Sequence, residues 1–268
     1  MNFASLPMYN PVETPGASAA LWIGLARHFR RAGITDVPDR LLERPAIPDH
    51  WFSPELLFSQ TCGYPLTHAL KGRVQLVATP CYETEGCEGP SYCSFVIVPA
   101  DSPAASLADL CGKRVAFNTQ DSQSGMNALR ALIAPLSGGK RFFAEAIETG
   151  SHAASLAAVA AGKADVAAID SVSFGLFRLH GRADEKAVRI LCRTDSAPSL
   201  PFITTANANP ELIMRLRDGL RSAMADRALA GARQALLLKD IMLLPDSAYQ
   251  PILDMEQAAG RQGYPQLA

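Results

Sequence analysis

The sequence predicts an α/β protein of two lobes, each with a mixed, mostly parallel sheet flanked by helices. Three observations indicate this fold class. Short apolar runs alternate with amphipathic segments of about ten to fifteen residues, which is the pattern of strands followed by covering helices. The alternation occurs on both sides of a loop rich in Gly, Glu and Cys at residues 80–90. The 268 residues are also enough for two lobes of about 100–150 residues each.

The chain before this loop forms one α/β series. Apolar residues between positions 17 and 32 gather on one face at helical spacing, which predicts a helix there. Further helices are predicted near residues 54–57 and 65–70. Strands are predicted over residues 2–8, 40–43, 57–59 and 73–79.

A second series begins with the continuous apolar run YCSFVIVP at residues 92–99. Strands are predicted next over residues 114–118, 142–148, 165–169, 187–193 and 201–205. Helices are predicted over residues 125–136, 153–161, 173–179, 210–224, 228–238 and 246–259. The strands near 92–99 and 187–194 bracket the middle of the chain, so we expect them to act as hinges. Lobe 1 would then comprise residues 1–91 and 195–268 and lobe 2 residues 92–194, with a ligand cleft between the lobes.

Composition excludes several classes of protein. The 25 basic and 26 acidic residues leave a net charge of −1, and no basic run could follow a phosphate backbone, so we expect no nucleic-acid partner. No window reaches the roughly 18 consecutive apolar residues of a membrane helix, so we expect no membrane insertion. The first sixteen residues, MNFASLPMYNPVETPG, have neither the basic region nor the apolar stretch of a secretory signal. This favours a cytoplasmic location, with a periplasmic one as the alternative if the chain is a processed form.

The six cysteines form no CxxC pair and no second cluster that would complete a zinc site. Cys81, Cys87 and Cys93 are evenly spaced near Gly and Pro residues. They leave two alternatives open: one disulfide or a metal site there, or free thiols in a reducing compartment. The pattern favours free thiols, and we expect neither a metal nor a cofactor.

The most informative stretch is RVAFNTQDSQSGMN at residues 114–127, where a strand ends in hydroxyl and amide side chains just before a helix. Free backbone N–H groups and the positive end of the helix dipole make such a start a natural anion site. Ser122 and Ser124 would add donors, and Gly125 would let a ligand approach the backbone. The alternative is an ordinary N-cap, in which a serine bonds to its own helix.

Two further strand ends carry polar residues. TGSH at residues 149–152 places Ser151 as a helix cap and His152 in the first turn, and the strand at 165–169 runs into Asp170. The carboxyl ends of parallel strands lie at one edge of a sheet, where open α/β sheets bind ligands. We therefore expect these polar residues to converge, although His152 could be a surface histidine and Asp170 only a cap.

Four runs resemble the phosphate/phosphonate-type substrate-binding proteins of ABC transporters, over about residues 1–205. The runs are SQTCGYPL (59–66), DSQSG (121–125), TGSHAASLAAVAAGKADVAAIDS (149–171) and SLPFIT (199–204). The third is the most specific, because its spacing matches as well as its residues. The resemblance implies the type II periplasmic binding protein fold and an ABC transporter permease as a partner.

The resemblance also assigns ligand-binding residues. It implies that a phosphonate or other tetrahedral anion binds at the helix start, where family members carry Ser-Thr-Ser and this chain has Ser122, Gln123 and Ser124. The remaining candidates are Gly125, Met126, Ser151 and His152, Asp170 facing a ligand amine, and, from the first lobe, Tyr9, Gln60, Thr61 and Tyr64.

We therefore expect a solute-binding protein that captures a small anion or zwitterion by lobe closure. Ser124, His152 and Asp170 have the composition of a hydrolase triad, but the sequence has no GxSxG elbow, and a serine at a helix start is better placed to hold an anion. The alternative is a cytoplasmic enzyme or ligand sensor of the same fold that acts on a small carboxylate or aromatic acid, with His152 or Asp170 as general base. Tyr64, Tyr82 and Tyr92 could stack on a ligand or simply pack.

Overall fold

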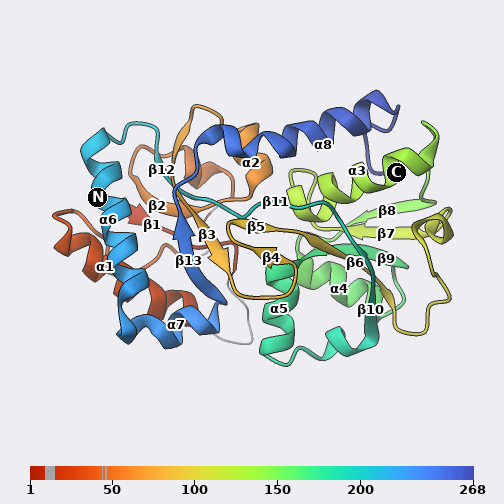
Figure 1. The fold of residues 1–268 in the computed structure, drawn as a ribbon, viewed down its shortest axis with the longest axis horizontal. Helices are drawn as coiled ribbons and strands as arrows, with labels where there is room; N and C mark the ends of the chain where they lie inside the picture. Colours follow the sequence, from red (N-terminus) through yellow and green to blue (C-terminus); the bar gives the residue numbers. More distant parts are fainter. Residues whose placement is uncertain (10–15, 44, 46) are drawn as a thin grey trace. The chain divides into compact units, whose positions relative to one another are not determined.

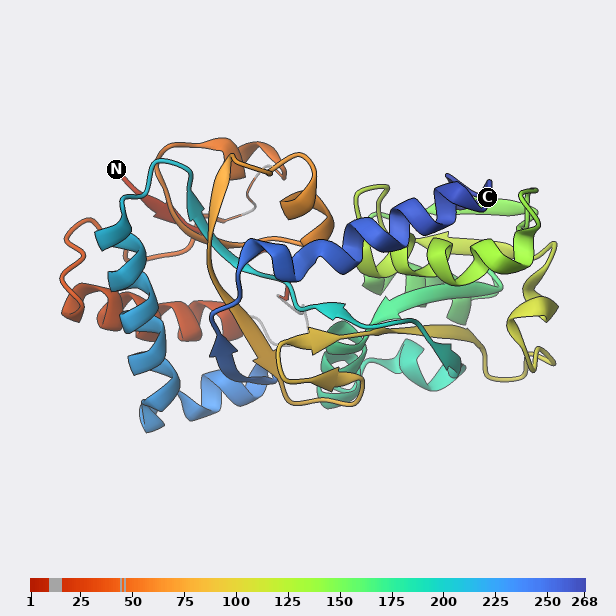
Figure 2. The same cartoon turned by 45° about the horizontal axis from the view of Figure 1, so that its top comes forward.

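The computed structural model describes residues 1–9, 16–43, 45 and 47–268 (Figures 1 and 2). The chain divides into two compact units. The first unit contains residues 1–83, 88–90 and 198–248. The second unit contains residues 84–87, 91–197 and 249–268. Residues 249–268 therefore belong to the second unit, whereas we expected them in lobe 1.

The first unit contains a five-stranded sheet of order β1–β2–β12–β3–β13. Its strands are β1 (Phe3–Ala4), β2 (Leu56–Gln60), β3 (Val74–Tyr82), β12 (Phe202–Thr205) and β13 (Leu238–Met242). Only the β1–β2 pairing is parallel, because β12 inserts between β2 and β3 and runs antiparallel to both. The expected mostly parallel sheet is therefore wrong for this unit, although β2 and β3 do run in the same direction.

Helices of the first unit are α1 (Ala17–Arg31), α2 (Gly63–Thr67), α6 (Pro210–Ala225) and α7 (Ala230–Ala235), with short 3₁₀ turns at Asp49–Phe52 and Arg227–Leu229. The apolar face of α1 packs against α6 and α7 (Figure 1). Gly219 of α6 allows the close approach, because a Cβ there would lie 2.5 Å from Phe29. Trp22 and Phe29 of α1 lie against Phe58 of β2 in the core. The predicted helix over 17–32 is thus confirmed.

The second unit contains a five-stranded sheet of order β10–β6–β9–β7–β8. Its strands are β6 (Ser94–Pro99), β7 (Arg114–Phe117), β8 (Glu145–Glu148), β9 (Val166–Asp170) and β10 (Val188–Arg193). β7 pairs in parallel with β8 and β9, so the carboxyl ends of these three strands share one edge. β6 runs antiparallel to β9 and β10, which places the start of β6 at that same edge. The predicted hinge strands are therefore paired with each other inside this sheet.

Helices of the second unit are α3 (Ala128–Ser137), α4 (His152–Ala160), α5 (Ser171–Leu179) and α8 (Gln250–Arg261). Short 3₁₀ turns lie at Leu107–Leu110 and Ala183–Ala187. The 3₁₀ turn Asp246–Tyr249 lies where the chain passes from the first unit to the second. Phe95, Ile169 and Phe174 are central to a core between the sheet and the helices. α8 packs against α3, and Asn127 Nδ2 donates to Ile252 O over 3.0 Å. This packing is the reason that α8 joins the second unit.

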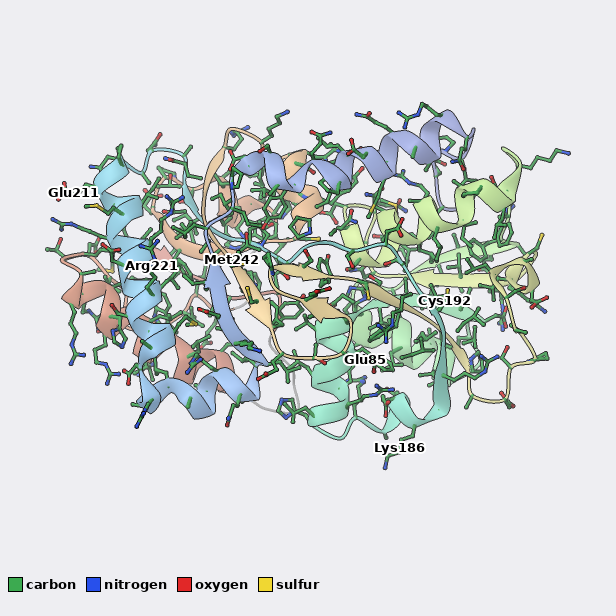
Figure 3. All side chains as sticks on the ribbon, in the orientation of Figure 1. Glu85, Lys186, Cys192, Glu211, Arg221 and Met242 are labelled. Atoms are coloured by element: carbon green, nitrogen blue, oxygen red, sulfur yellow. The ribbon has the colours of Figure 1, made fainter. Side chains whose placement is uncertain are left out.

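The segment Thr84–Cys87 is held within the second unit. Glu85 (Figure 3) accepts hydrogen bonds from Arg178 over 3.2 Å and from Arg193 over 2.5 Å. Cys87 Sγ lies 3.3 Å from Ser171 Oγ at the start of α5. A small third sheet has the order β11 (Ala197–Pro198), β5 (Ser91–Tyr92) and β4 (Cys87–Glu88).

Several local predictions are wrong. Residues 40–43 form no strand, because Leu42 makes one backbone bond to Ala4 and no ladder continues from it. Residues 54–57 form no helix, since β2 begins at Leu56. The helix expected over 228–238 ends at Ala235, and β13 follows it. β13 pairs with the end of β3, which extends to Tyr82 where we expected a loop.

All six cysteines carry free thiols in this structure. Burial raises the pKa of the Cys81, Cys93 and Cys192 thiols. Within the described part of the chain, no helix is both long and apolar enough to cross a membrane.

Candidate functional site

The end of β7 leads into a helix start of unusual geometry. Ser122 caps this start, and its Oγ accepts a hydrogen bond from the Gly125 N–H over 3.0 Å. The first turn, Gln123–Asn127, is a π-helix, and Asn127 N donates to Ser122 O over 2.9 Å. This turn continues directly into α3. Such wide turns occur frequently at functional sites.

Two other strand ends lead into helices beside it. Asp170 ends β9 and caps α5, because its Oδ1 accepts from the Ser173 N–H over 2.8 Å. α4 begins at His152, and Ser151 caps it by accepting from the Ala154 N–H over 3.1 Å. Ser122, Ser151 and Asp170 therefore each cap a helix, and Asp170 also contacts His152.

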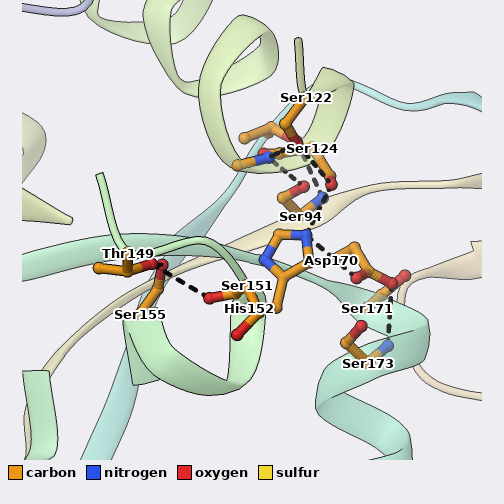
Figure 4. Close-up of polar contacts among 12 residues, drawn as sticks. Ser94, Ser122, Ser124, Thr149, Ser151, His152, Ser155, Asp170, Ser171 and Ser173 are labelled. Carbon is orange, nitrogen blue, oxygen red and sulfur yellow. Dashed lines mark hydrogen bonds and ion pairs between the residues drawn. The ribbon is translucent and has the colours of Figure 1, made fainter. Parts of the chain in front are cut away.

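Side chains from these strand ends meet in one buried polar cluster (Figure 4). His152 Nε2 lies 2.8 Å from Ser124 Oγ and 3.2 Å from Asp170 Oδ2. Ser124 Oγ in turn lies 3.5 Å from Ser122 Oγ. Ser122, Ser124, His152 and Asp170 thus converge as predicted, because the parallel strands β7 and β9 end at the same edge. We call these four residues the edge cluster.

The sequence did not single out two further residues: Ser94, which contacts the edge cluster, and Asn118, which lies beside Gly125. Ser94 Oγ donates to Ser124 O over 3.0 Å, and Ser94 is paired with Asp170 in the β6–β9 register. Asn118 directly follows β7, and a Cβ on Gly125 would lie only 2.1 Å from its Oδ1. That Oδ1 is buried and has no hydrogen-bond partner among the described residues. The available signal was a polar residue directly after, or at the start of, an apolar strand.

The histidine of the edge cluster is poised to be neutral. Burial holds the pKa of His152 below its usual value, while the charge of Asp170 and the backbone of Ala168 act in the opposite direction. Its side chain is only 13% exposed, and that of Asp170 is 2% exposed. A neutral imidazole with a hydrogen on Nε2 can donate to a ligand oxygen, to Ser124 or to Asp170.

The contacts differ from those of a hydrolase triad. In a triad, the serine bonds to one imidazole nitrogen and the carboxylate to the other. Here Ser124 Oγ and Asp170 Oδ2 both face the same nitrogen, Nε2 of His152. The arrangement therefore fixes the position of an imidazole and a hydroxyl but does not set up proton removal from Ser124.

Three other predicted residues of this unit lie outside the edge cluster. Gln123 Nε2 lies 3.1 Å from Met255 Sδ of α8, and Gln123 Oε1 accepts from Asn127. The Ser151 hydroxyl is used by its own helix, and Met126 is buried. Their assignment as ligand contacts stays a prediction. No group of three or more His, Cys, Asp or Glu side chains that could hold a metal occurs in residues 1–9, 16–43, 45 and 47–268.

The first unit contains the other candidates. Gln60 Nε2 donates to Tyr82 Oη over 2.8 Å and to Leu200 O over 3.0 Å. Tyr9 packs edge-on against Tyr82, with ring centroids 5.2 Å apart. Thr61 is fully buried. Tyr64 stacks on His68 at 3.8 Å. Tyr9 and Gln60 therefore meet at Tyr82, and the ligand roles of all four stay predictions.

Comparison with known proteins identifies relatives. The family model described as "ABC transporter, phosphonate, periplasmic substrate-binding protein" matches residues 55–254. A binding-protein component of a phosphonate ABC transporter from Pseudomonas aeruginosa is 16% identical, with TM-score 0.77 and coverage of 98% of this chain and 88% of that one. PhnD1 from Prochlorococcus marinus, solved with methylphosphonate, is 13% identical, with TM-score 0.76 and coverage of 97% and 98%. XAC2383 from Xanthomonas citri, solved with ATP, is 19% identical, with TM-score 0.71 and coverage of 97% of each chain.

Proposed function

This chain belongs to the family of periplasmic substrate-binding proteins of phosphonate ABC transporters, and from that membership we propose that its edge cluster holds the oxyanion of a small phosphonate-like ligand. The observation that carries the proposal is the placement of Ser124. Its hydroxyl stands at a buried helix start within 2.8 Å of an imidazole nitrogen. The fold shared with the solved binding proteins agrees with this role.

The chemistry of the site suits an anion held by neutral donors. The N–H groups of a first helical turn have no carbonyl partners one turn back, and the helix dipole adds positive potential there. Hydroxyl groups of Ser122 and Ser124 and the neutral imidazole of His152 supply further donors. The buried carboxylate of Asp170 orients the imidazole through a 3.2 Å contact.

The role of Asp170 toward a ligand amine is a finer question. One of its oxygens caps α5 and the other faces His152, so both have partners within the unit. We propose that Asp170 acts by positioning His152 and the start of α5. A direct contact with a ligand amine is the competing role.

We propose that the protein captures its ligand unchanged and delivers it to a membrane permease. The family is one of substrate-binding proteins, which supports binding over catalysis. The shared contact of Ser124 and Asp170 with a single imidazole nitrogen supports it as well. The family is periplasmic in ABC transport systems, and the cytoplasmic location favoured by the N-terminal residues finds no support in this match.

Isothermal titration calorimetry tests the proposal. The wild-type protein is titrated with methylphosphonate, 2-aminoethylphosphonate, phosphate, sulfate and acetate. We expect saturable binding of at least one phosphonate or phosphate and none of acetate. Ser124→Ala should weaken binding by about tenfold or more, because a buried donor to an anion is worth roughly 1–3 kcal/mol. Ser106→Ala is the matched control, since Ser106 caps an exposed turn of the same unit.

Two results would contradict the proposal. The first is equal affinity of the wild-type protein and Ser124→Ala for the best ligand. The second is recovery of that ligand in chemically altered form after incubation, with the change abolished in His152→Ala. The second result would establish the enzyme alternative.

A further inference from the structure

A buried ladder of polar side chains joins the helix start of the edge cluster to α8. Gln123, Asn127 and Arg130 lie at positions i, i+4 and i+7 of the continuous helix, so they share one of its faces. α8 runs along α3 in this unit (Figures 1 and 2). We call these three residues the ladder. Ser124 immediately follows the first of them in the chain.

The first two members of the ladder make direct contacts. Asn127 Nδ2 donates to Gln123 Oε1 over 2.7 Å and to Ile252 O of α8 over 3.0 Å. Asn127 is completely buried, and Gln123 is 1% exposed. The π-turn that carries Ser124 is therefore hydrogen-bonded, through the Asn127 side chain, to the backbone of α8.

Arg130 closes the ladder. Its Nη2 donates to Asn127 Oδ1 and its Nη1 to Pro265 O, each over 2.6 Å. Glu256 Oε1 of α8 lies 3.6 Å from Nη2. The Arg130 side chain is 6% exposed, and a charge buried to that degree is tolerated only when its partners stay in place.

The ladder contacts the turn that carries Ser124. A π-turn holds one residue more than an α-turn and is rare, so contacts from outside the turn matter for keeping it. Conversion to an α-turn would change the direction of Ser124, which lies within the turn. On one side of the turn, Gln123 and Asn127 contact α8. On the other side, Ser124 contacts Ser94 and His152.

We propose that Asn127 and Arg130 are positioning residues for ligand binding. Their contacts with residues 250–268 hold the π-turn, and with it Ser124, in the binding geometry. The inference rests on the proposed function, because it concerns the same site. Residues outside the edge cluster, on the face of the helix that contacts α8, would then set the affinity for the ligand.

Amide hydrogen exchange of the ligand-free protein provides the first test. In Asn127→Leu, we expect the amides of residues 123–127 to exchange at least about tenfold faster than in the wild-type protein, and those of β6 and β9 to be unchanged. Asp254→Ala is the matched control, because it removes an exposed hydrogen bond with Gln250 on the same helix and leaves the ladder intact. Unchanged exchange at 123–127 in Asn127→Leu would overturn the inference, whatever ligand the protein binds.

Calorimetry with the best phosphonate or phosphate provides the second test. Asn127→Leu should lose about tenfold in affinity at a temperature where circular dichroism shows it folded, and Asp254→Ala should match the wild-type protein. If Asn127→Leu does not fold, Met255→Leu and Arg130→Lys replace it. Met255→Leu conserves volume and removes only the sulfur acceptor of Gln123, and Arg130→Lys keeps the charge but cannot serve both carbonyl partners.

The two proposals fail in different ways. If the wild-type protein binds none of the oxyanions, the proposed function fails, and the exchange result still decides whether the ladder holds the turn. If the wild-type protein binds and Ser124→Ala weakens binding, while the ladder variants keep wild-type affinity, the positioning role is refuted and the proposed function stands.

Discussion

His152 and Asp170 meet through one nitrogen and one oxygen, Nε2 and Oδ2, at 3.2 Å and almost without solvent exposure. The contact joins the first residue of α4 to the last residue of β9. Ser124 Oγ faces the same nitrogen, so Nε2 of His152 lies between the Ser124 hydroxyl and the Asp170 carboxylate.

The first prediction concerns the space between the helix start and Asn118. In Gly125→Ala, the new Cβ would lie 2.1 Å from Asn118 Oδ1 and 3.2 Å from His152 Cε1, so Asn118 must shift and His152 is crowded. We expect a loss of about 1–3 kcal/mol in unfolding free energy from overpacking, together with weaker ligand binding. Urea denaturation measures the stability. Gly260→Ala is the control, because that position on α8 has open space and alanine should stabilise it by about 0.5–1 kcal/mol.

The second prediction compares two helix caps whose hydrogen bonds have the same length. Asp170 and Asn209 each accept a backbone N–H at 2.8 Å, but Asn209 is exposed and Asp170 is buried. Asn209→Ala should cost about 1 kcal/mol. Asp170→Ala should cost about 1–3 kcal/mol more, because it leaves the part-buried Ser173 N–H without its cap and also removes the carboxylate that contacts the buried His152. Equal losses in denaturant titrations would show that the contact with His152 adds nothing to stability.

The third prediction tests the role of Asp170 toward an amine. In Asp170→Asn the cap oxygen remains while the charge is lost. If Asp170 acts by positioning His152, the affinities for methylphosphonate and 2-aminoethylphosphonate should fall by the same factor in calorimetry. A selective loss for the amino compound would instead assign Asp170 to the ligand amine.

The fourth prediction concerns pH. Burial lowers the pKa of His152 below its ordinary value of 6.5, so the folded protein takes up this proton only at lower pH than the unfolded chain does. The unfolded state therefore binds more protons as the pH falls through 6.5, and the folded state loses stability in that window. At higher pH, His152 is neutral in both states and does not change the unfolding free energy.

Denaturant titrations from about pH 8 to pH 5 check this sign. Unfolding free energy should fall less steeply with decreasing pH in His152→Gln than in the wild-type protein. His180→Gln, at the end of α5 and outside the edge cluster, controls for the loss of a histidine in general. A steeper fall in His152→Gln than in the wild-type protein would reverse the sign and contradict a buried neutral imidazole.

Much of the fold could be predicted from local pattern. The helix over 17–31 and the strands around 94–99 and 166–170 follow from apolar spacing within each segment, which the amphipathic period encodes directly. β13 was missed because LKDIM becomes a strand only by pairing with β3, a segment far away in sequence. α8 was assigned to the wrong unit for the same reason, since its partner is α3.

The edge cluster was predictable for a specific physical reason. Parallel strands end at one edge, so polar residues at the ends of β7 and β9 had to approach one another, and Ser124, His152 and Asp170 do. Ser94 could not be found in this way, because its place depends on β6 running antiparallel to β9.

Segment by segment, the chain specifies its amphipathic helices, its buried strands and the polar caps between them, because these depend on residues within one or two turns of each other. Contacts between distant segments decide the directions of individual side chains. Gln123 and Ser124 are neighbours in sequence with similar polarity, yet one faces α8 and the other His152. Burial is the reason, because a polar side chain enclosed by packing needs a hydrogen-bond partner. Only the folded arrangement provides Met255 and Asn127 as partners for Gln123, and the imidazole of His152 as the partner for Ser124.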